Sequence, residues 1–136
     1  MMDGTYGAIV RALDDYFDGF YEGDVERLKR IFEPSAHLYS ATDGPLQDDP
    51  MEVVYERVRG RTPPAATRQK RYDRILMIDV AGPEAALAKV QLAIGPKLFT
   101  DYLTLLRRDG IWRINSKTYT YVPIAVETEE GAGAAA

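Results

Sequence analysis

The sequence predicts an α+β domain in which N-terminal helices cover one face of an antiparallel sheet. Two observations lead to this prediction. Apolar residues recur at helical spacing from residue 5 to about residue 59, and from residue 71 to residue 122 they alternate as in strands. Helices followed by a run of strands pack as two layers, because each element must bury its apolar side against the other.

Length and composition narrow the class of protein. A chain of 136 residues is expected to form one domain, here residues 1–126, with a core of its own. The absence of cysteine excludes disulfides and thiol catalysis and fits the cytoplasm. A net charge of -4 argues against nucleic-acid binding, and no apolar run reaches the roughly 18 residues of a membrane span.

Three helices are expected in the first half of the chain. Residues 5–22 carry apolar side chains at helical spacing on one side and acids on the other. Gly23 suits a left-handed C-cap, and Asp24 caps a short second helix that Pro34 ends. A strand at 36–41 and a loop at 42–48 follow. Asp49 and Glu52 form a capping box, with Pro50 between them at the first helical position, for a third helix to about residue 59.

Four consecutive strands are expected after the helices, over residues 72–82, 85–95, 97–106 and 111–122. Short turns with glycine separate them. The last ten residues, 127–136, offer nothing to pack and are expected to be a disordered tail. The basic segment 57–74 has two interpretations: a rim that binds anions, or charges that face solvent, which is the more common case.

One acid stands out in the third of these strands. Asp101 alternates in phase with the apolar Leu103 and Leu105 and therefore falls on the inner face. A three-residue turn ending at Gly110 would place Lys117 directly opposite Asp101, where it supplies the charge partner that burial demands. In this register Asn115 and Tyr119 share the inner face.

The other face of the same hairpin is also partly apolar. It carries Tyr102, Thr104, Leu106, Trp112 and Ile114. The helices can cover only one face of the sheet, so the second is expected to be covered by another copy of the chain, in a homodimer.

The segments "EGDVERLKRIF", "EPSAHLYS" and "FTDYLTLLRRDGIWRI" together resemble the nuclear transport factor 2-like superfamily, and within it the SnoaL-like and putative lumazine-binding groups. The resemblance implies a cone: a strongly curved antiparallel sheet wrapped around the helices and enclosing a pocket. It also implies a homodimer formed through the sheet.

Ketosteroid isomerases of that superfamily hold an oxyanion with a tyrosine and an acid, to which Tyr16 and Asp101 correspond in the resemblance. Their aspartate base falls at Ser40, which cannot shuttle a proton without a partner base. His37, the one histidine, alternates with Leu38 toward the outer face, and it lacks the companions that a metal site needs. The catalytic candidates are therefore Asp101, Tyr16 and His37, with no metal and no cofactor expected.

The candidate ligand-binding residues are expected to line the inside of the cone: Tyr16, Phe20, Ser40, Tyr55, Asp101, Asn115, Lys117 and Tyr119. Three functions stay open. The first is a protein that binds a small hydrophobic molecule and lacks the isomerase base. The second is an enzyme of the cyclase, isomerase or dehydratase type acting on an aromatic or polycyclic substrate. The third is a dimeric adaptor that acts through its outer sheet face.

Overall fold

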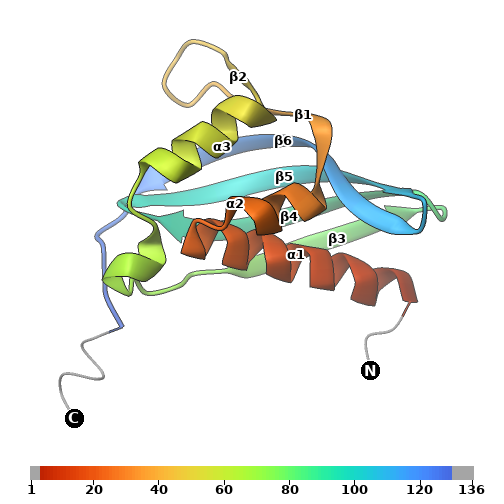
Figure 1. Ribbon diagram of the computed structural model, residues 1–136, viewed down its shortest axis with the longest axis horizontal. Helices are drawn as coiled ribbons and strands as arrows, with labels where there is room; N and C mark the ends of the chain where they lie inside the picture. The colour runs from red at the N-terminus through yellow and green to blue at the C-terminus, as the bar shows by residue number, and fades with distance from the viewer. Residues whose placement is uncertain (1–3, 130–136) are drawn as a thin grey trace.

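The computed structural model describes residues 4–129 of the chain. Three α-helices lie on one side of a six-stranded sheet that curves around them (Figure 1). The strand order across the sheet is β2-β1-β6-β5-β4-β3. The elements are α1 (Gly4–Glu22), α2 (Val25–Ile31), β1 (Phe32–Ser40), β2 (Gln47–Pro50), α3 (Met51–Gly60), the 3-10 helix η1 (Pro64–Thr67), β3 (Arg74–Ala81), β4 (Ala85–Ile94), β5 (Lys97–Arg108) and β6 (Ile111–Pro123).

The α+β class is confirmed, with one difference in the sheet. Strands β3 to β6 form the expected antiparallel meander. Strand β1 pairs with β6 in parallel, so the sheet is mixed. Strand β2, which falls in the expected loop 42–48 and just beyond it, adds an antiparallel edge next to β1. Its sequence is Gln-Asp-Asp-Pro, so it lacks the alternation of apolar and polar residues that would predict a strand.

The helix ends follow their capping residues in two of three cases. Asp24 accepts a hydrogen bond from the backbone of Arg27 at 3.1 Å, and Gly23 has the left-handed φ of 68° that ends α1. The prediction of a capping box at Asp49 is wrong. Pro50 occupies the N-cap position without a side-chain bond, while the Asp49 carboxylate accepts from Arg57 at 2.6 Å instead.

The core lies between the helices and the concave face of the sheet. The inward side of α1, which includes Ile9, Leu13 and Tyr16, is fully buried against Leu103 and the other inward residues of the sheet. Helices α1 and α2 pack closely at Gly19, where an added Cβ would lie 2.6 Å from a methyl group of Leu28. No helix in the described part of the chain is both long and apolar enough to cross a membrane.

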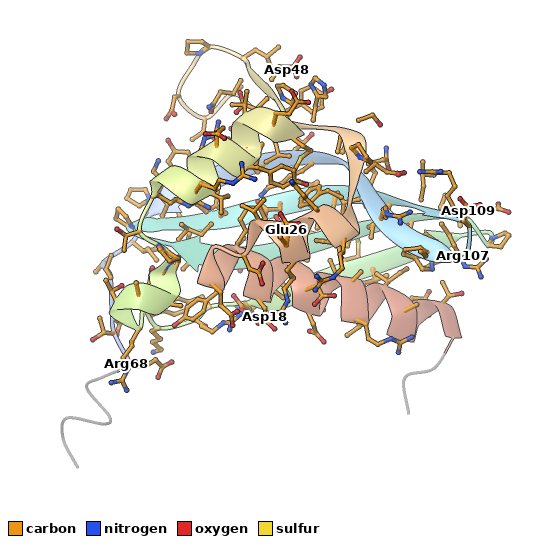
Figure 2. The ribbon with its side chains drawn as sticks, viewed as in Figure 1. Asp18, Glu26, Asp48, Arg68, Arg107 and Asp109 are labelled. Carbon is orange, nitrogen blue, oxygen red and sulfur yellow. The ribbon has the colours of Figure 1, made fainter. Side chains whose placement is uncertain are left out.

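The β5–β6 hairpin differs from the predicted register. Its turn has two residues, Asp109 and Gly110, both with positive φ, and Arg108 pairs with Ile111. Further along, a bulge at Asn115 adds one unpaired residue to β6. Figure 2 shows Asp109 at the tip of this hairpin, at the opposite end of the molecule from Arg68.

These two differences explain which predicted faces are right. Between the turn and the bulge the phase is inverted, so Trp112 and Ile114 are buried in the core and not on the outer face. Asn115 lies on the outer face instead of the pocket wall. The shorter turn and the bulge each shift the strand pairing by one residue. Beyond the bulge the total shift is two residues, so the side chains again fall on the predicted faces. Lys117 therefore shares the inner face with Asp101, although its direct partner across the ladder is Leu103.

The start of the expected tail is held against the body of the protein. Thr128 forms a bridge with Gln69, and the backbone N–H of Lys70 donates to the carbonyl of Glu127 at 2.7 Å. The Gln69 side chain is buried and bonds both the N–H and the carbonyl of Gly95, at 2.9 and 2.8 Å. The remainder of the expected tail, residues 130–136, lies outside the described residues.

Candidate functional site

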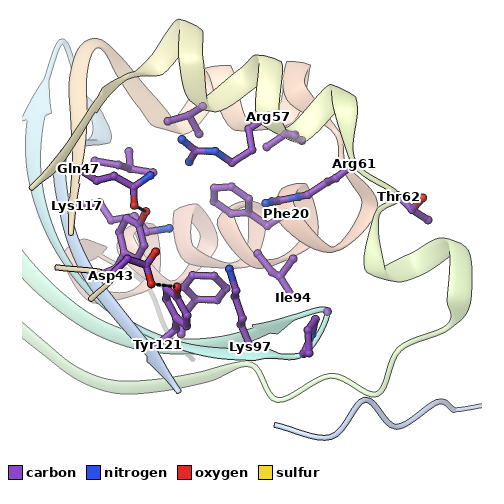
Figure 3. Close-up of a pocket in the computed structure, with 17 residues that line it drawn as sticks. Phe20, Asp43, Gln47, Arg57, Arg61, Thr62, Ile94, Lys97, Lys117 and Tyr121 are labelled. Atoms are coloured by element: carbon purple, nitrogen blue, oxygen red, sulfur yellow. Dashed lines mark hydrogen bonds between the residues drawn. The ribbon is translucent and has the colours of Figure 1, made fainter. Parts of the chain in front are cut away.

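An open cavity of about 400 Å³ lies between the inner face of the sheet and the helices (Figure 3). Its apolar wall comes from α1, α3 and the strands, and consists of Phe20, Leu38, Val54, Val58, Ile94 and Phe99. Its polar wall includes Asp43, Gln47, Arg57, Arg61, Lys97, Lys117, Tyr119 and Tyr121. The size is that of a site for a small organic ligand.

Three polar side chains from three elements meet beneath this cavity. Tyr16 of α1 donates a hydrogen bond to Oδ2 of Asp101 on β5, at 2.5 Å. Nζ of Lys117 on β6 lies 3.5 Å from the same oxygen. The exposed fractions of Tyr16, Asp101 and Lys117 are 0%, 0% and 5%, so the three groups interact almost without solvent. The second carboxylate oxygen, Oδ1, has no hydrogen-bond partner within residues 4–129.

Burial shifts the proton affinities of all three groups. Burial, followed by the charge of Asp101, raises the pKa of Tyr16 well above its usual range, so its hydroxyl stays a donor at neutral pH. Burial raises the pKa of Asp101 against the opposing influence of Lys117. Burial lowers the pKa of Lys117 against the opposing influence of Asp101. The carboxylate and the amine therefore differ less in proton affinity here than they do in water.

Aromatic rings surround the lysine. Nζ of Lys117 lies 5.1 Å from the ring centroid of Tyr16, 4.7 Å from that of Phe20 and 5.3 Å from that of Tyr119. The ring faces attract the ammonium, and at the same time they keep water from it. Figure 3 shows Lys117 extending from its strand into the space beside Phe20.

Positive charge continues up the wall of the cavity. Arg57 lies in α3, and Arg61 directly follows the end of that helix. The two residues are four positions apart, so their side chains point to the cavity from the same side, as Figure 3 shows. Arg57 is bound to Asp49, whereas no carboxylate of the described chain lies within 4.0 Å of Arg61. Burial, followed by the charge of Arg57, lowers the pKa of Arg61. Lys97, across the cavity, has its Nζ 4.4 Å from the ring centroid of Tyr121.

The carboxylates near the cavity do not balance these cations. Asp43 accepts a hydrogen bond from Tyr121 at 2.5 Å, and Asp49 and Asp101 are held by Arg57 and by the buried residues below. Among the wall and its direct partners, four cations thus face three carboxylates. The site is an apolar cavity with an excess of positive charge.

Other predicted ligand-binding residues lie outside the cavity. Ser40 is buried, but its hydroxyl bonds Thr42 at 3.2 Å and does not belong to the wall. Tyr55 lies in a second hollow, of about 380 Å³, where Lys29 sits over its ring. Tyr55 faces away because α3 presents residues 54, 57, 58 and 61 to the cavity and turns the intervening residue outward.

His37 is on the outer side of β1, as its alternation predicts. Its Nδ1 lies 2.6 Å from a carboxylate oxygen of Asp48 on β2, and its ring stacks on Tyr39. It is not part of the cavity wall, so it cannot reach a ligand bound there. Within residues 4–129 no group of three or more histidine and acidic side chains is arranged to hold a metal ion.

The sequence prediction missed Arg57, Arg61 and Lys97. The signal was partly present, because the two arginines belong to the basic segment 57–74 that was considered as an anion-binding rim. In the structure the two ends of that segment have different surroundings. Arg57 and Arg61 face the cavity. Arg71 does not line the cavity and pairs instead with Asp18, at a distance of 2.7 Å.

The curved sheet, the three helices and the open cavity between them define a protein of the nuclear transport factor 2-like superfamily. Within that superfamily the chain belongs to the family described as "Putative lumazine-binding", whose family model matches residues 5–120.

Known structures and one curated protein are similar to this chain. A crystal structure of an NTF2-like protein of unknown function from Shewanella baltica OS155 has a TM-score of 0.78 and 27% identity, over 89% of this chain and 99% of that one. A second, from Silicibacter pomeroyi DSS-3, has a TM-score of 0.73 and 24% identity over 85% and 93%. Aldolase FrzH of Cladobotryum sp is 24% identical over 120 residues, 87% of this chain and 92% of that protein.

Proposed function

We propose that the protein binds a small organic anion with a flat apolar body in the cavity inside the cone. The observation that carries this proposal is the excess of positive charge on a wall that is part apolar and part polar. Arg61 in particular is half-buried and has no carboxylate partner within residues 4–129, so a ligand anion would supply the partner that the fold does not.

The family and its fold support a ligand of this kind. A cavity of about 400 Å³ admits a molecule of two or three fused rings. The apolar residues of α1 and α3 would contact the ring faces, while the arginines would pair with an acidic group at the edge. A lumazine, which the family description names, is a flat fused bicycle with polar N–H and carbonyl groups at its edge, so its shape suits this cavity.

The test is calorimetric titration with 1-naphthoate and with its neutral isostere 1-naphthamide. Naphthoate should bind about tenfold more tightly, because one charge-assisted contact contributes about 1.5 kcal/mol. Arg61→Gln should remove this difference, while the control Arg74→Gln, on exposed β3, should keep it. Equal affinities for both compounds, with no effect of Arg61→Gln, would rule out the proposal.

An enzyme is the second candidate function, and the hydrogen-bonded pair of Tyr16 and Asp101 below the cavity favours it. The positive wall could stabilise an enolate or another oxyanion formed during a cyclisation, isomerisation or dehydration. The similarity to Aldolase FrzH supports carbonyl chemistry of this type. Ser40 stands at the position of the ketosteroid isomerase base, and within residues 4–129 its hydroxyl bonds Thr42 and no acid or histidine that could serve as a base.

We also propose that the protein is a homodimer through the outer face of the sheet and acts in the cytoplasm. Tyr102 and Leu106 project from that face with exposed fractions of 42% and 45%, and Thr104 lies between them. A second copy would cover these side chains. In the adaptor alternative, the same face would instead receive another protein.

A further inference from the structure

Lys117 is unlike the other lysines of the chain. Its side chain has an exposed fraction of 6%, whereas Lys29 has 46%, and Lys70 and Lys97 are exposed as well. It is nevertheless part of the cavity wall, so a bound molecule can reach it. A buried amine at the inner end of a ligand cavity is in the position of a nucleophile.

An amine attacks a carbonyl group only after it has lost a proton, and the site contains an acceptor for that proton. Nζ of Lys117 lies 3.5 Å from Oδ2 of Asp101. Tyr16 already donates to that oxygen, which leaves Oδ1 of the same carboxylate without a partner in the described chain. Asp101 can therefore take the proton without losing its hydrogen bond from Tyr16.

Burial and the nearby arginines favour the neutral form of the amine, while Asp101 and the ring faces oppose them by attracting the ammonium. The rings of Tyr16, Phe20 and Tyr119 exclude water, and the positive charges of Arg57 and Arg61 oppose a further cation nearby. Burial also raises the pKa of the acceptor Asp101. The neutral amine is thus more accessible here than at the protein surface.

We propose that Lys117 forms a Schiff base with an aldehyde or ketone group of the bound anion, and that Asp101 takes and returns its proton. This inference rests on the proposed function, because the positive wall is what brings the anionic carbonyl compound to the amine. The chemistry places the substrate among oxo compounds with an acidic group, and the reaction among aldol-type additions or cleavages.

The steps balance without a redox partner. Lys117 gives one proton to Asp101, and its Nζ then forms a bond to the carbonyl carbon while the carbonyl π bond breaks. The proton held by Asp101 passes to the oxygen and gives a carbinolamine. Loss of one water molecule forms the protonated C=N bond, whose positive charge faces the ionised Asp101. In the addition direction, the ionised Asp101 takes the proton from the carbon next to the iminium, and the electron pair of that C–H bond forms an enamine. In the cleavage direction, Asp101 takes the proton of the β-hydroxyl group, whose carbon becomes a carbonyl as the C–C bond breaks and its electron pair forms the same enamine.

Reductive trapping tests the proposal on the wild-type protein. The protein is incubated at pH 7 with 4-carboxybenzaldehyde, an anionic aromatic aldehyde, and sodium cyanoborohydride, and the adduct is located by peptide mass mapping. We expect one adduct, on Lys117, formed at least about tenfold faster than on Lys97, because the cavity holds the bound aldehyde beside an amine whose neutral form is favoured by burial. Lys97 is the internal control, because it borders the same cavity but is exposed.

Two variants sharpen the result. Lys117→Arg keeps the charge but should lose the adduct. Asp101→Asn removes the charge that favours the protonated amine, but it also removes the acid that returns the proton to the carbonyl oxygen; we expect the second effect to prevail, so that adduct formation slows at Lys117 and is unchanged at exposed Lys70. Circular dichroism of both variants checks that they fold. Adducts spread over the exposed lysines, or labelling that Lys117→Arg does not alter, would overturn the proposal.

The two proposals can fail separately. Binding of 4-methylbenzoate, measured by calorimetry, with no adduct on Lys117 refutes the Schiff base and keeps the proposed function. Labelling of Lys117 by neutral benzaldehyde as fast as by 4-carboxybenzaldehyde supports the reactive amine and refutes selection of an anion. If neither binding nor labelling is observed, both proposals are refuted.

Discussion

Replacing Lys117 by methionine should cost the protein about 3 kcal/mol of unfolding free energy at pH 7. The variant fills a similar volume but leaves the carboxylate of Asp101 buried with only Tyr16 as a partner. Removing one member of a buried ion pair costs about 3–5 kcal/mol, and the remaining hydrogen bond from Tyr16 argues for the lower end. For a urea m-value of about 2 kcal/mol/M, the midpoint should fall by about 1.5 M.

The pH dependence identifies the cause of this loss. Burial already raises the pKa of Asp101, and the loss of the lysine charge would raise it further. A carboxyl group whose pKa is higher in the folded state binds more protons there than in the unfolded chain. The contribution of this carboxyl group to folding stability is therefore most favourable at a pH below its pKa in the unfolded chain, and it declines as the pH rises through its pKa in the folded protein. Lys117→Met should accordingly be closer to wild type at pH 5 than at pH 7.

Urea denaturation followed by circular dichroism at both pH values provides the measurement. Lys97→Met, a change at the exposed mouth of the same cavity, should alter stability by less than about 0.5 kcal/mol. The double variant Asp101→Asn with Lys117→Met should recover much of the loss, because no buried charge then remains. A loss below about 1 kcal/mol for Lys117→Met, equal at both pH values, would show that Asp101 does not depend on this lysine.

Three further changes test the packing and the outer face. Gly19→Ala should cost about 1–3 kcal/mol in urea denaturation, because its Cβ would lie 2.6 Å from Leu28, whereas Gly60→Ala, with no atom within 4 Å, should cost nothing and serves as the control. Trp112→Ala should cost about 3–5 kcal/mol, since that side chain is 5% exposed and belongs to the core; a loss of association with unchanged stability would contradict this. Leu106→Arg should convert the proposed dimer to a folded monomer in sedimentation velocity, and an unchanged dimer would exclude this face as the interface.

The fold was predictable from the sequence to the extent that its signals are local. Helical spacing, capping by Asp24 and the alternation of the last four strands all depend on neighbouring residues. The parallel pairing of β1 with β6 joins segments that are far apart in the chain, and no alternation pattern encodes which strand lies beside which. Strand β2 is an edge strand of three polar residues and a proline, and its sequence shows no alternation that would predict a strand.

The candidate site was predictable in part, because an acid in phase with core residues is expected to have a charge partner. The assumed three-residue turn placed Lys117 opposite Asp101, and that turn was one residue too long. The bulge at Asn115 shifted the register by one more residue and restored the phase. Nothing in the alternation around Asn115 announces a bulge, so Trp112 was assigned to the wrong face.

The bridge between Thr128 and Gln69 fixes a segment beside the opening of the cavity, so under the proposed function it would bear on ligand entry. Gln69 holds Gly95, which borders the cavity, and its chain leads back to Arg61 on the opposite wall. Residues 127–129 are thus joined to a segment that runs from one side of the cavity opening to the other. If the cavity takes up a ligand as proposed, removing the contact of Thr128 with Gln69 should change the exchange rate of that ligand, although neither residue lines the cavity.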